Sequence, residues 1–203
     1  MPDIVSYCSI DKKGVSLNGM PFYNNDSNKD TLAFFDSILH YFEIKYPKYS
    51  KMDLLAKLGF LTSEILLSKL PDIKERFSPY DLGILMANKS SSLHTDLHYW
   101  ETTKQIPSPS AFVYTLPNVV NAEICIRNGF KGENTFLIAD DFLSSGIIEY
   151  AKILFDKQLV KFCLCGWIEL LGDNFNSIIF AVEENETSLG KFSKETVSNI
   201  LNL

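Results

Sequence analysis

The first group of residues that could support chemistry lies in one segment, which has the pattern of a strand, a sharp turn and a helix. A Gly-x-x-Gly turn at residues 129–132 leads into the apolar run Thr135–Ala139, which predicts a strand. Apolar residues at helical spacing then predict a helix from about Phe142 to Asp156. The turn between strand and helix is made of Asp140, Asp141, Phe142 and Leu143. Such a turn could present a nucleophile, yet it contains no cysteine.

Two hydroxyl groups lie next to this turn. Ser144 and Ser145 are candidate nucleophiles, but a serine needs a base and an oxyanion hole. No histidine follows them in the sequence, although one could approach in space. The alternative is that both hydroxyls belong to the first turn of a buried helix, where serine is favoured. The adjacent carboxylates of Asp140 and Asp141 diverge on a strand or a helix, so they are poorly placed to share a proton.

Two histidines form a second candidate site. His94 and His98 are spaced i, i+4, so they lie on one face of a predicted helix and could share a metal ion. The pattern is not His-Glu-x-x-His, and no third ligand is evident. Tyr99 and Trp100 follow, and aromatic residues beside polar ones are common at interfaces. The pattern favours a solvated or partner-facing helix over a metal site.

The cysteines point to packing and not to chemistry. Cys163 and Cys165 alternate along a predicted strand and therefore share one face. They do not form a Cys-x-x-Cys pair, and no histidine cluster completes a zinc site with them or with Cys8 and Cys125. We therefore expect buried thiols in a reducing compartment, no metal site and no cofactor.

Length and composition narrow the class of protein. The 203 residues allow one domain with a substantial core, and no linker divides them, so we expect a single domain over residues 1–203. The net charge is −6 and the basic residues are scattered, which argues against nucleic acid as a partner. No apolar run is long enough to span a bilayer, and the N-terminus has no signal-peptide pattern. We expect a cytoplasmic protein.

Strands alternate with helices along the chain, which predicts an α/β fold with a mixed central sheet and helices on both faces. The almost wholly apolar run Leu82–Ala87 is typical of a central strand that is covered on both sides. On the helix that follows the turn, one set of residues can face the sheet and another can face water. The first set is Ile147, Ile148, Ala151, Leu154 and Phe155, and the second is Glu149, Lys152 and Asp156.

Helix boundaries are predicted from caps and prolines. A helix over Thr31–Tyr46 begins after the cap Asp30, and a second helix follows a capping box in which Ser50 caps and Asp53 reaches back. Pro71 should end that second helix. A further helical segment extends from about Pro107 to Asn128, and the proline at position 117 should kink or break it.

Several weak motifs occur together in the order and spacing of one enzyme family. A Ser-Pro-Ser motif at residues 108–110 and the pair Asn118 and Asn121 precede the turn, and Cys165-Gly166-Trp167-Ile168-Glu169 follows it. Over about residues 4–184, the sequence resembles the N-terminal half of β-ketoacyl-ACP synthases, of the thiolase superfamily. It is similar to short, half-length ketosynthase-like proteins that are found with aryl-polyene or flexirubin-like pigment pathways and lipid synthesis genes. The resemblance implies one half of a thiolase-like layered fold, with Asn118, Asn121 and Phe142 near the pocket.

The sequence departs from the family where the chemistry is performed. In the family the turn reads roughly Thr-Ala-Cys-x-Ser-Gly, and its cysteine is acylated; the matching positions here fall within Asp140–Leu143. Asp141 suits a helix N-terminus but is no acyl acceptor for this exchange. The family takes two histidines from its C-terminal half, which we expect to be missing here. His40, His94 and His98 all precede the turn, so by position they are not those histidines.

The resemblance also implies a partner. In the superfamily, the strand that matches Thr135–Ala139 pairs antiparallel with its twin across a dimer interface, and an apolar edge strand is otherwise an aggregation risk. We expect a homodimer, or a heterodimer with a true ketosynthase. Acyl carrier protein is itself usually acidic, so an acidic chain is expected to meet it only indirectly.

Three functions follow from these observations. The favoured one is a non-catalytic ketosynthase-like subunit that partners a condensing enzyme in fatty acid or polyketide biosynthesis of the polyene pigment type, as chain-length factors do. The second is an acyltransferase or hydrolase with altered chemistry at Ser144, Ser145 or the aspartate pair. The third is a module that binds an acyl chain or another small ligand. A stable acyl adduct would favour the second, and co-purified lipid the third.

Overall fold

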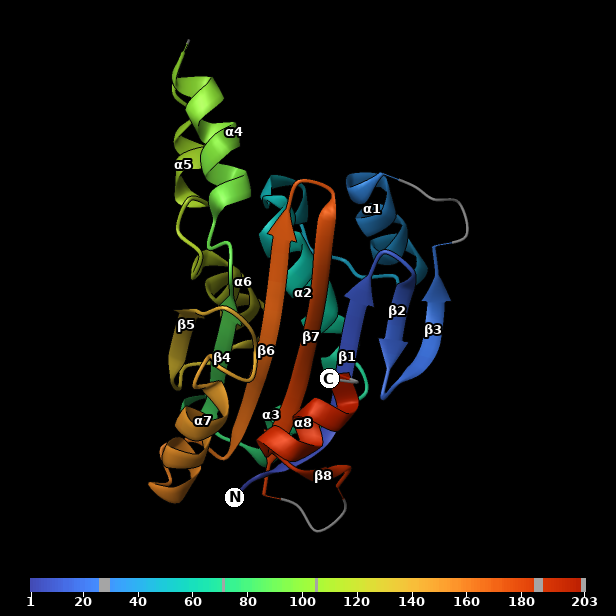
Figure 1. Ribbon diagram of the computed structural model, residues 1–203, viewed down its shortest axis with the longest axis vertical. Coiled ribbons are helices and arrows are strands. Elements are labelled where there is room, and N and C mark those ends of the chain that lie inside the picture. Colours follow the sequence, from blue (N-terminus) through green and yellow to red (C-terminus); the bar gives the residue numbers. More distant parts are fainter. Residues whose placement is uncertain (26–29, 71, 105, 185–187, 202–203) are drawn as a thin grey trace.

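The computed structural model describes residues 1–25, 30–70, 72–104, 106–184 and 188–201. Its described strands form one eight-stranded mixed sheet in the order β3-β2-β1-β7-β6-β4-β5, and β8 pairs with β1 (Figure 1). The strands are β1 (Asp3–Asp11), β2 (Gly14–Leu17), β3 (Met20–Asn24), β4 (Leu82–Asn88), β5 (Asn134–Ile138), β6 (Phe162–Leu171), β7 (Asn174–Glu183) and β8 (Gly190–Lys191). The helices are α1 (Thr31–Tyr41), α2 (Leu54–Leu67), α3 (Ile73–Arg76), α4 (Leu93–Thr103), α5 (Pro109–Val113), α6 (Val119–Asn128), α7 (Ile147–Asp156) and α8 (Lys194–Leu201). The predicted α/β class is confirmed.

The middle of the sheet is the most deeply buried part of the chain. β4 runs parallel to both of its neighbours, β5 and β6, whereas β6 and β7 form an antiparallel hairpin. Every residue of β4 is buried, as the apolar run Leu82–Ala87 predicted. The hairpin turns at Gly172, whose φ of 60° is easily adopted by glycine. β5 lies at one edge of the sheet and β3 at the other.

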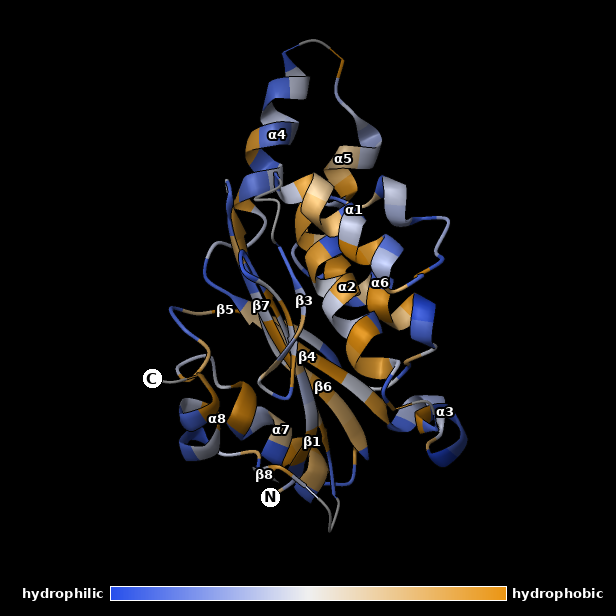
Figure 2. Ribbon diagram, turned by 90° about the vertical axis from the view of Figure 1, so that its right-hand side faces the viewer, coloured by the Kyte–Doolittle hydropathy of each residue, from blue (hydrophilic) through white to orange (hydrophobic). Residues whose placement is uncertain are grey.

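Helices cover both faces of the sheet, as expected. α1, α2 and α6 lie on one face, and α7 and α8 lie on the other (Figure 2). α7 buries Ile147, Ile148, Ala151, Leu154 and Phe155 and exposes Glu149, Lys152 and Asp156, which confirms the two sets assigned from helical spacing. No helix in the described ranges is both long enough and apolar enough to cross a bilayer.

The predicted end of α1 and the predicted cap of α2 are wrong. α1 ends at Tyr41 and not at Tyr46, because the chain turns at Glu43, which has a φ of 52°. α2 is capped by Asp53, whose carboxylate accepts the backbone N–H of Ala56 at 2.9 Å, whereas Ser50 lies in a separate 3₁₀ turn.

Two boundary predictions are confirmed and one is untested. The Asp30 carboxylate caps α1 by accepting the backbone N–H of Ala33 at 2.8 Å. The predicted break at Pro117 separates α5 from α6. Pro71, predicted to end α2, lies outside the described residues.

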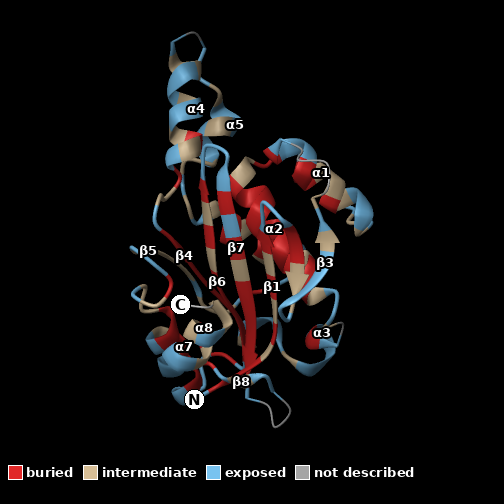
Figure 3. Cartoon of the chain, turned by 45° about the vertical axis from the view of Figure 1, so that its right-hand side comes forward, coloured by how far each residue is buried: buried red, intermediate tan, exposed pale blue. Residues whose placement is uncertain are grey.

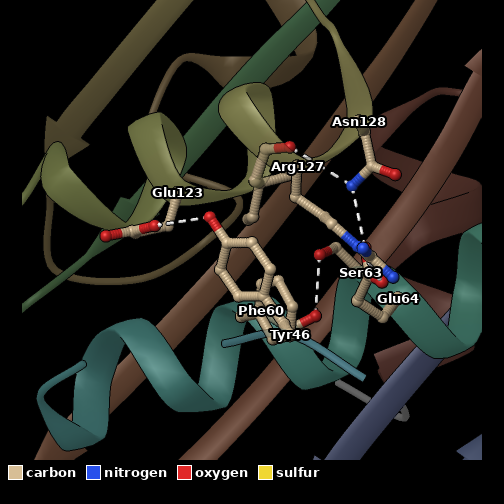
Figure 4. A network of polar contacts seen from close by, with 8 residues as sticks. Tyr46, Phe60, Ser63, Glu64, Glu123, Arg127 and Asn128 are labelled. Atoms are coloured by element: carbon tan, nitrogen blue, oxygen red, sulfur yellow. Dashed lines mark hydrogen bonds and ion pairs between the residues drawn. The ribbon is translucent and has the colours of Figure 1, made fainter. Parts of the chain in front are cut away.

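A polar network fixes α6 between α2 and the edge strand. The Glu64 carboxylate of α2 accepts hydrogen bonds from Arg127 Nε at 3.0 Å and from Asn128 Nδ2 at 2.9 Å (Figure 4). The buried Glu123 carboxylate accepts the hydroxyl of Tyr46 at 3.2 Å. On the same helix, Asn121 Nδ2 donates to the carbonyl oxygen of Thr135 in β5 at 3.0 Å. These contacts join α6 to α2 and to β5.

Candidate functional site

The turn after β5 is longer than predicted, because α7 begins at Ile147 and not at Phe142. Asp141 Oδ1 accepts the backbone N–H of Ser144 at 2.9 Å, and Ser145 Oγ donates to the carbonyl oxygen of Phe142 at 2.6 Å. Gly146, with a φ of 80°, then redirects the chain into the helix. The helix starts late because serine and aspartate side chains bond to the backbone of their own turn.

The described contacts of both serine hydroxyls serve this turn. Ser144 is exposed and its Oγ donates to the carbonyl oxygen of Asp141 at 3.1 Å, while the half-buried Ser145 bonds to Phe142. Among the described hydrogen bonds, neither hydroxyl has a histidine partner. His94 lies on α4, where its Nδ1 accepts the backbone N–H of Gly172 at 3.2 Å.

Phe142 turns inward and fills the space beneath the turn. Its side chain is 5% exposed. Its ring centroid lies 5.7 Å from that of Phe180 on β7 and 6.4 Å from that of Phe192, which precedes α8. The last two rings are 5.8 Å apart, so three segments distant in sequence meet in one aromatic cluster. The Phe142 side chain therefore anchors the turn to the core through apolar contacts.

The two aspartates of the turn have separate partners. Asp140 Oδ1 lies 3.4 Å from Lys89 Nζ. The hydrogen bond from the backbone N–H of Ser144 lowers the pKa of Asp141, and the Lys89 charge acts in the same direction. Both carboxyl groups are exposed. Because each has its own partner, the geometry does not bring them together as a proton-sharing pair.

An open cleft of about 800 Å³ adjoins the turn, at the ends of β4, β5 and β6. Its apolar lining includes Phe142, Trp167 and Ile178, and its rim carries charges of both signs. The charged and polar lining residues include Lys12, Lys13, Lys89, Asp140, Asp141 and Glu169. Glu169 Oε2 accepts the backbone N–H groups of Lys89 at 2.7 Å and of Ser90 at 3.2 Å, which fixes the loop after β4 at the cleft.

The structure does not bring Asn118 and Asn121 to this cleft with Phe142. Asn118 is exposed at the start of α6, and Asn121 is buried, where its Nδ2 bonds to Asn134 Oδ1 and to the carbonyl oxygen of Thr135. α6 packs on the α2 side of the sheet, whereas Phe142 belongs to the cluster on the α7 side. The sheet therefore separates the asparagines from the phenylalanine.

The remaining candidates have ordinary surroundings. Cys163 and Cys165 are free and buried and share one face of the sheet, as their spacing predicted, and this face is the one that α7 covers. Burial raises the pKa of the Cys8 thiol to about 12 and that of Cys125 to about 11, which makes both poor nucleophiles. The described His, Cys, Asp and Glu side chains include no group of three that could hold a metal ion.

Some residues that line the cleft were not predicted from the sequence. Lys12 and Lys13 come from the β1–β2 hairpin, and Ile178 comes from β7, far along the chain from the turn. The motif Cys165–Glu169 contained a usable signal, because Trp167 and Glu169 alternate with buried residues and so face the same side of β6.

No protein-family model matches the sequence, and no curated protein matches it. Solved structures do match. The chain is similar to the ishigamide ketosynthase/chain length factor, with a TM-score of 0.67 and 15% identity over 93% of this chain and 63% of that one. It is also similar to a chain in the complex of the ketosynthase ApeO with its chain length factor ApeC from Xenorhabdus doucetiae, with a TM-score of 0.60 and 10% identity over 99% of this chain and 90% of that one.

A third match is the AntDE:AntF complex, in which a type II PKS acyl-carrier protein is bound to its ketosynthase. The TM-score is 0.63 and the identity 13%, over 91% of this chain and 62% of that one. The chain thus spans less than two thirds of the length of two of these three matched chains. At such low identity, the likeness is one of fold. The chain has the thiolase-like fold of ketosynthases and chain length factors.

Proposed function

We propose that the chain is a non-catalytic ketosynthase-like subunit that partners a condensing enzyme in fatty acid or polyketide biosynthesis of the polyene pigment type. The observation that carries the proposal is Phe142, a buried phenylalanine in the turn where the resemblance would put an acylated cysteine. A phenyl ring forms no thioester, and the nearby serine hydroxyls are engaged in the turn. Similar structures contain a ketosynthase with its chain length factor, which supports a partner role.

The two edges of the sheet differ in a way that favours β5 as the partner-binding edge. β3 contains Pro21, and its pairing with β2 is irregular between Val15 and Ser16. Proline and bulges are devices that prevent an edge from pairing with another strand. β5 has neither device. It pairs with β4 in continuous register, and it contains no proline and no charged residue.

The backbone of β5 has groups available for such pairing. The carbonyl oxygen of Glu133 accepts the backbone N–H of Ile84 at 2.8 Å, and the backbone N–H of Ala139 donates to the carbonyl oxygen of Asn88 at 2.9 Å. Because backbone direction alternates along a strand, Phe136 and Ile138 direct their N–H and C=O groups away from β4. A strand of the ketosynthase placed there would extend the sheet. The alternative partner is a second copy of this chain. In the complex with a ketosynthase, acyl carrier protein would contact this chain only indirectly, through the ketosynthase.

The experiment that tests the proposal measures complex formation and acylation together. The purified chain is incubated with acyl and malonyl thioesters, alone and with the cysteine-bearing ketosynthase encoded nearest to it in the same genome. We expect a stable complex by light scattering and no added mass on this chain by intact-mass spectrometry. Turnover of a malonyl thioester by this chain alone, or a strict monomer under both conditions, would contradict the proposal.

The cleft supports a second candidate, a module that binds an acyl chain or a similar ligand. The apolar lining of Phe142, Trp167 and Ile178 could contact a hydrocarbon chain, and the lysines at the rim could contact an anionic head group. Native mass spectrometry of the freshly purified chain would detect a co-purified lipid. An acyl adduct that disappears in Ser145→Ala would instead favour serine chemistry.

Two further expectations belong to the proposal. We treat residues 1–203 as one domain, because all described strands share one sheet. We also keep the cytoplasmic location that the sequence suggested, which fractionation of the producing cells would test.

A further inference from the structure

Helix α4 presents its apolar stripe to the solvent. Leu93, Leu97 and Trp100 are spaced i, i+4, i+7, so they share one face of the helix. Their exposed fractions are 42%, 57% and 65%. The opposite side carries Thr95, which is 4% exposed, and the half-buried Tyr99. A surface helix normally buries its apolar face, so the orientation of α4 is the reverse of the usual one.

The helix is fixed in this orientation by contacts at its base. The Thr95 hydroxyl donates to the Asp53 carboxylate, the residue that caps α2. Ser92 Oγ donates to the carbonyl oxygen of Thr115 at 2.6 Å, and the backbone N–H of Gly172 donates to His94 Nδ1 at 3.2 Å. These polar contacts hold the inner side of α4 to three other segments. The exposure of the stripe is therefore built into the packing of the helix.

α4 and α5 together project beyond the end of the sheet, on the side where β5 forms the edge (Figures 1 and 3). Figure 3 shows most of this projection as exposed. The ring centroids of Tyr99 on α4 and Phe112 on α5 lie 5.5 Å apart, so α5 packs against the inner side of α4 and leaves the stripe uncovered. The α4–α5 projection, which carries the stripe, and the edge of β5 thus lie on the same side of the sheet.

We propose that Leu93, Leu97 and Trp100 of α4 form the second part of the contact with the ketosynthase partner and dock in an apolar groove on it. This inference rests on the proposed function. A stable interface buries about 800 Å² on each partner, and the five residues of β5 are too short an edge to supply that area alone. An apolar helix face with anchors at i, i+4, i+7 is a recurring way to extend such a contact, and tryptophan is enriched among the residues that dominate binding.

The test uses charge placed in the stripe. The double variant Leu97→Lys with Trp100→Lys is compared with the natural chain for binding to the cysteine-bearing ketosynthase encoded nearest to it. The matched control is Met20→Lys on β3, which replaces an apolar residue that is 75% exposed at the far edge of the sheet. We expect the double variant to raise the Kd by about 30-fold or more and the control to leave it unchanged. Both should keep the natural melting temperature, because the substituted side chains are exposed.

The outcomes separate this inference from the proposed function. If the double variant binds the ketosynthase as well as the natural chain does, while Ile138→Pro on β5 abolishes binding, the inference is wrong and the proposed function stands. If the natural chain does not bind the ketosynthase, both are wrong. If the double variant loses only self-association and keeps ketosynthase binding, the choice of partner is wrong. A photo-crosslinking residue at position 100 should attach to the ketosynthase in the mixed complex.

Discussion

The ring centroids of Phe142 and Phe180 lie 5.7 Å apart, which ties the turn after β5 to the middle of β7. Phe192, from the segment before α8, completes the cluster. The turn is therefore held by aromatic packing beneath it and by serine and aspartate bonds within it. In this arrangement the Phe142 side chain packs inside the fold and does not lie at the surface of the turn.

Truncating the Phe142 side chain should destabilise the protein strongly. Phe142→Ala is expected to lower the free energy of unfolding by about 3 kcal/mol, because it removes a buried aromatic side chain and leaves a cavity. The matched control is Phe112→Ala, because Phe112 is 55% exposed and its truncation should cost less than about 1 kcal/mol. Urea denaturation followed by circular dichroism measures both. Equal effects of the two substitutions would contradict the role assigned to Phe142.

The C-terminal helix should be required for a closed core on this side of the sheet. Val197 of α8 is fully buried in the same cluster of residues as Phe142 and Phe192. Val197→Asp buries an unpaired carboxylate and is expected to destabilise the protein by about 3 kcal/mol or to release α8. Binding of the dye ANS should then increase. Asn199→Asp, at an exposed position of the same helix, should change neither stability nor dye binding.

Blocking the edge of β5 should prevent association and leave the fold intact. Ile138→Pro removes a backbone N–H that points away from β4, so the hydrogen bonds between β4 and β5 remain. Light scattering should show loss of the complex with the ketosynthase or of a homodimer. The equivalent test at the other edge is Phe22→Lys on β3, which should leave association unchanged. Complex formation by Ile138→Pro at natural strength would rule out β5 as the interface.

Asp141 should titrate below the ordinary range of aspartate. The hydrogen bond from the backbone N–H of Ser144 favours the charged form and lowers the pKa of Asp141. Because the pKa of Asp141 is lower in the folded chain, its ionised carboxylate stabilises the fold at pH values above the pKa that Asp141 has in the unfolded chain. This stabilisation is lost as the pH falls through the pKa of Asp141 in the folded chain. Carbon NMR of the side-chain carboxyl would measure the pKa. Ser144→Ala keeps the backbone donor and removes the hydroxyl, so the pKa should rise only part of the way to the ordinary value.

Much of the fold could be predicted from the local pattern of apolar and capping residues. The apolar run of β4, the two faces of α7 and the cap at Asp30 were predicted correctly, because each depends on burial or hydrogen bonds within a few residues. The predicted end of α1 was wrong because the chain turns at Glu43, and the predicted start of α2 was wrong because two residues could cap the helix. Both Ser50 and Asp53 can cap a helix, and only the path of the chain between Tyr49 and Asp53 selected the aspartate.

The sequence by itself determined that the turn has no cysteine and that an apolar strand precedes it, since both are properties of residue order. Only the tertiary structure decided which residues share a site. It put Asn121 and Phe142 on opposite faces of the sheet, brought Phe192 to the turn, and directed the stripe of α4 outward. The physical reason is that these relations depend on packing between segments far apart in the chain, and the spacing of residues along one segment carries no information about what the others cover.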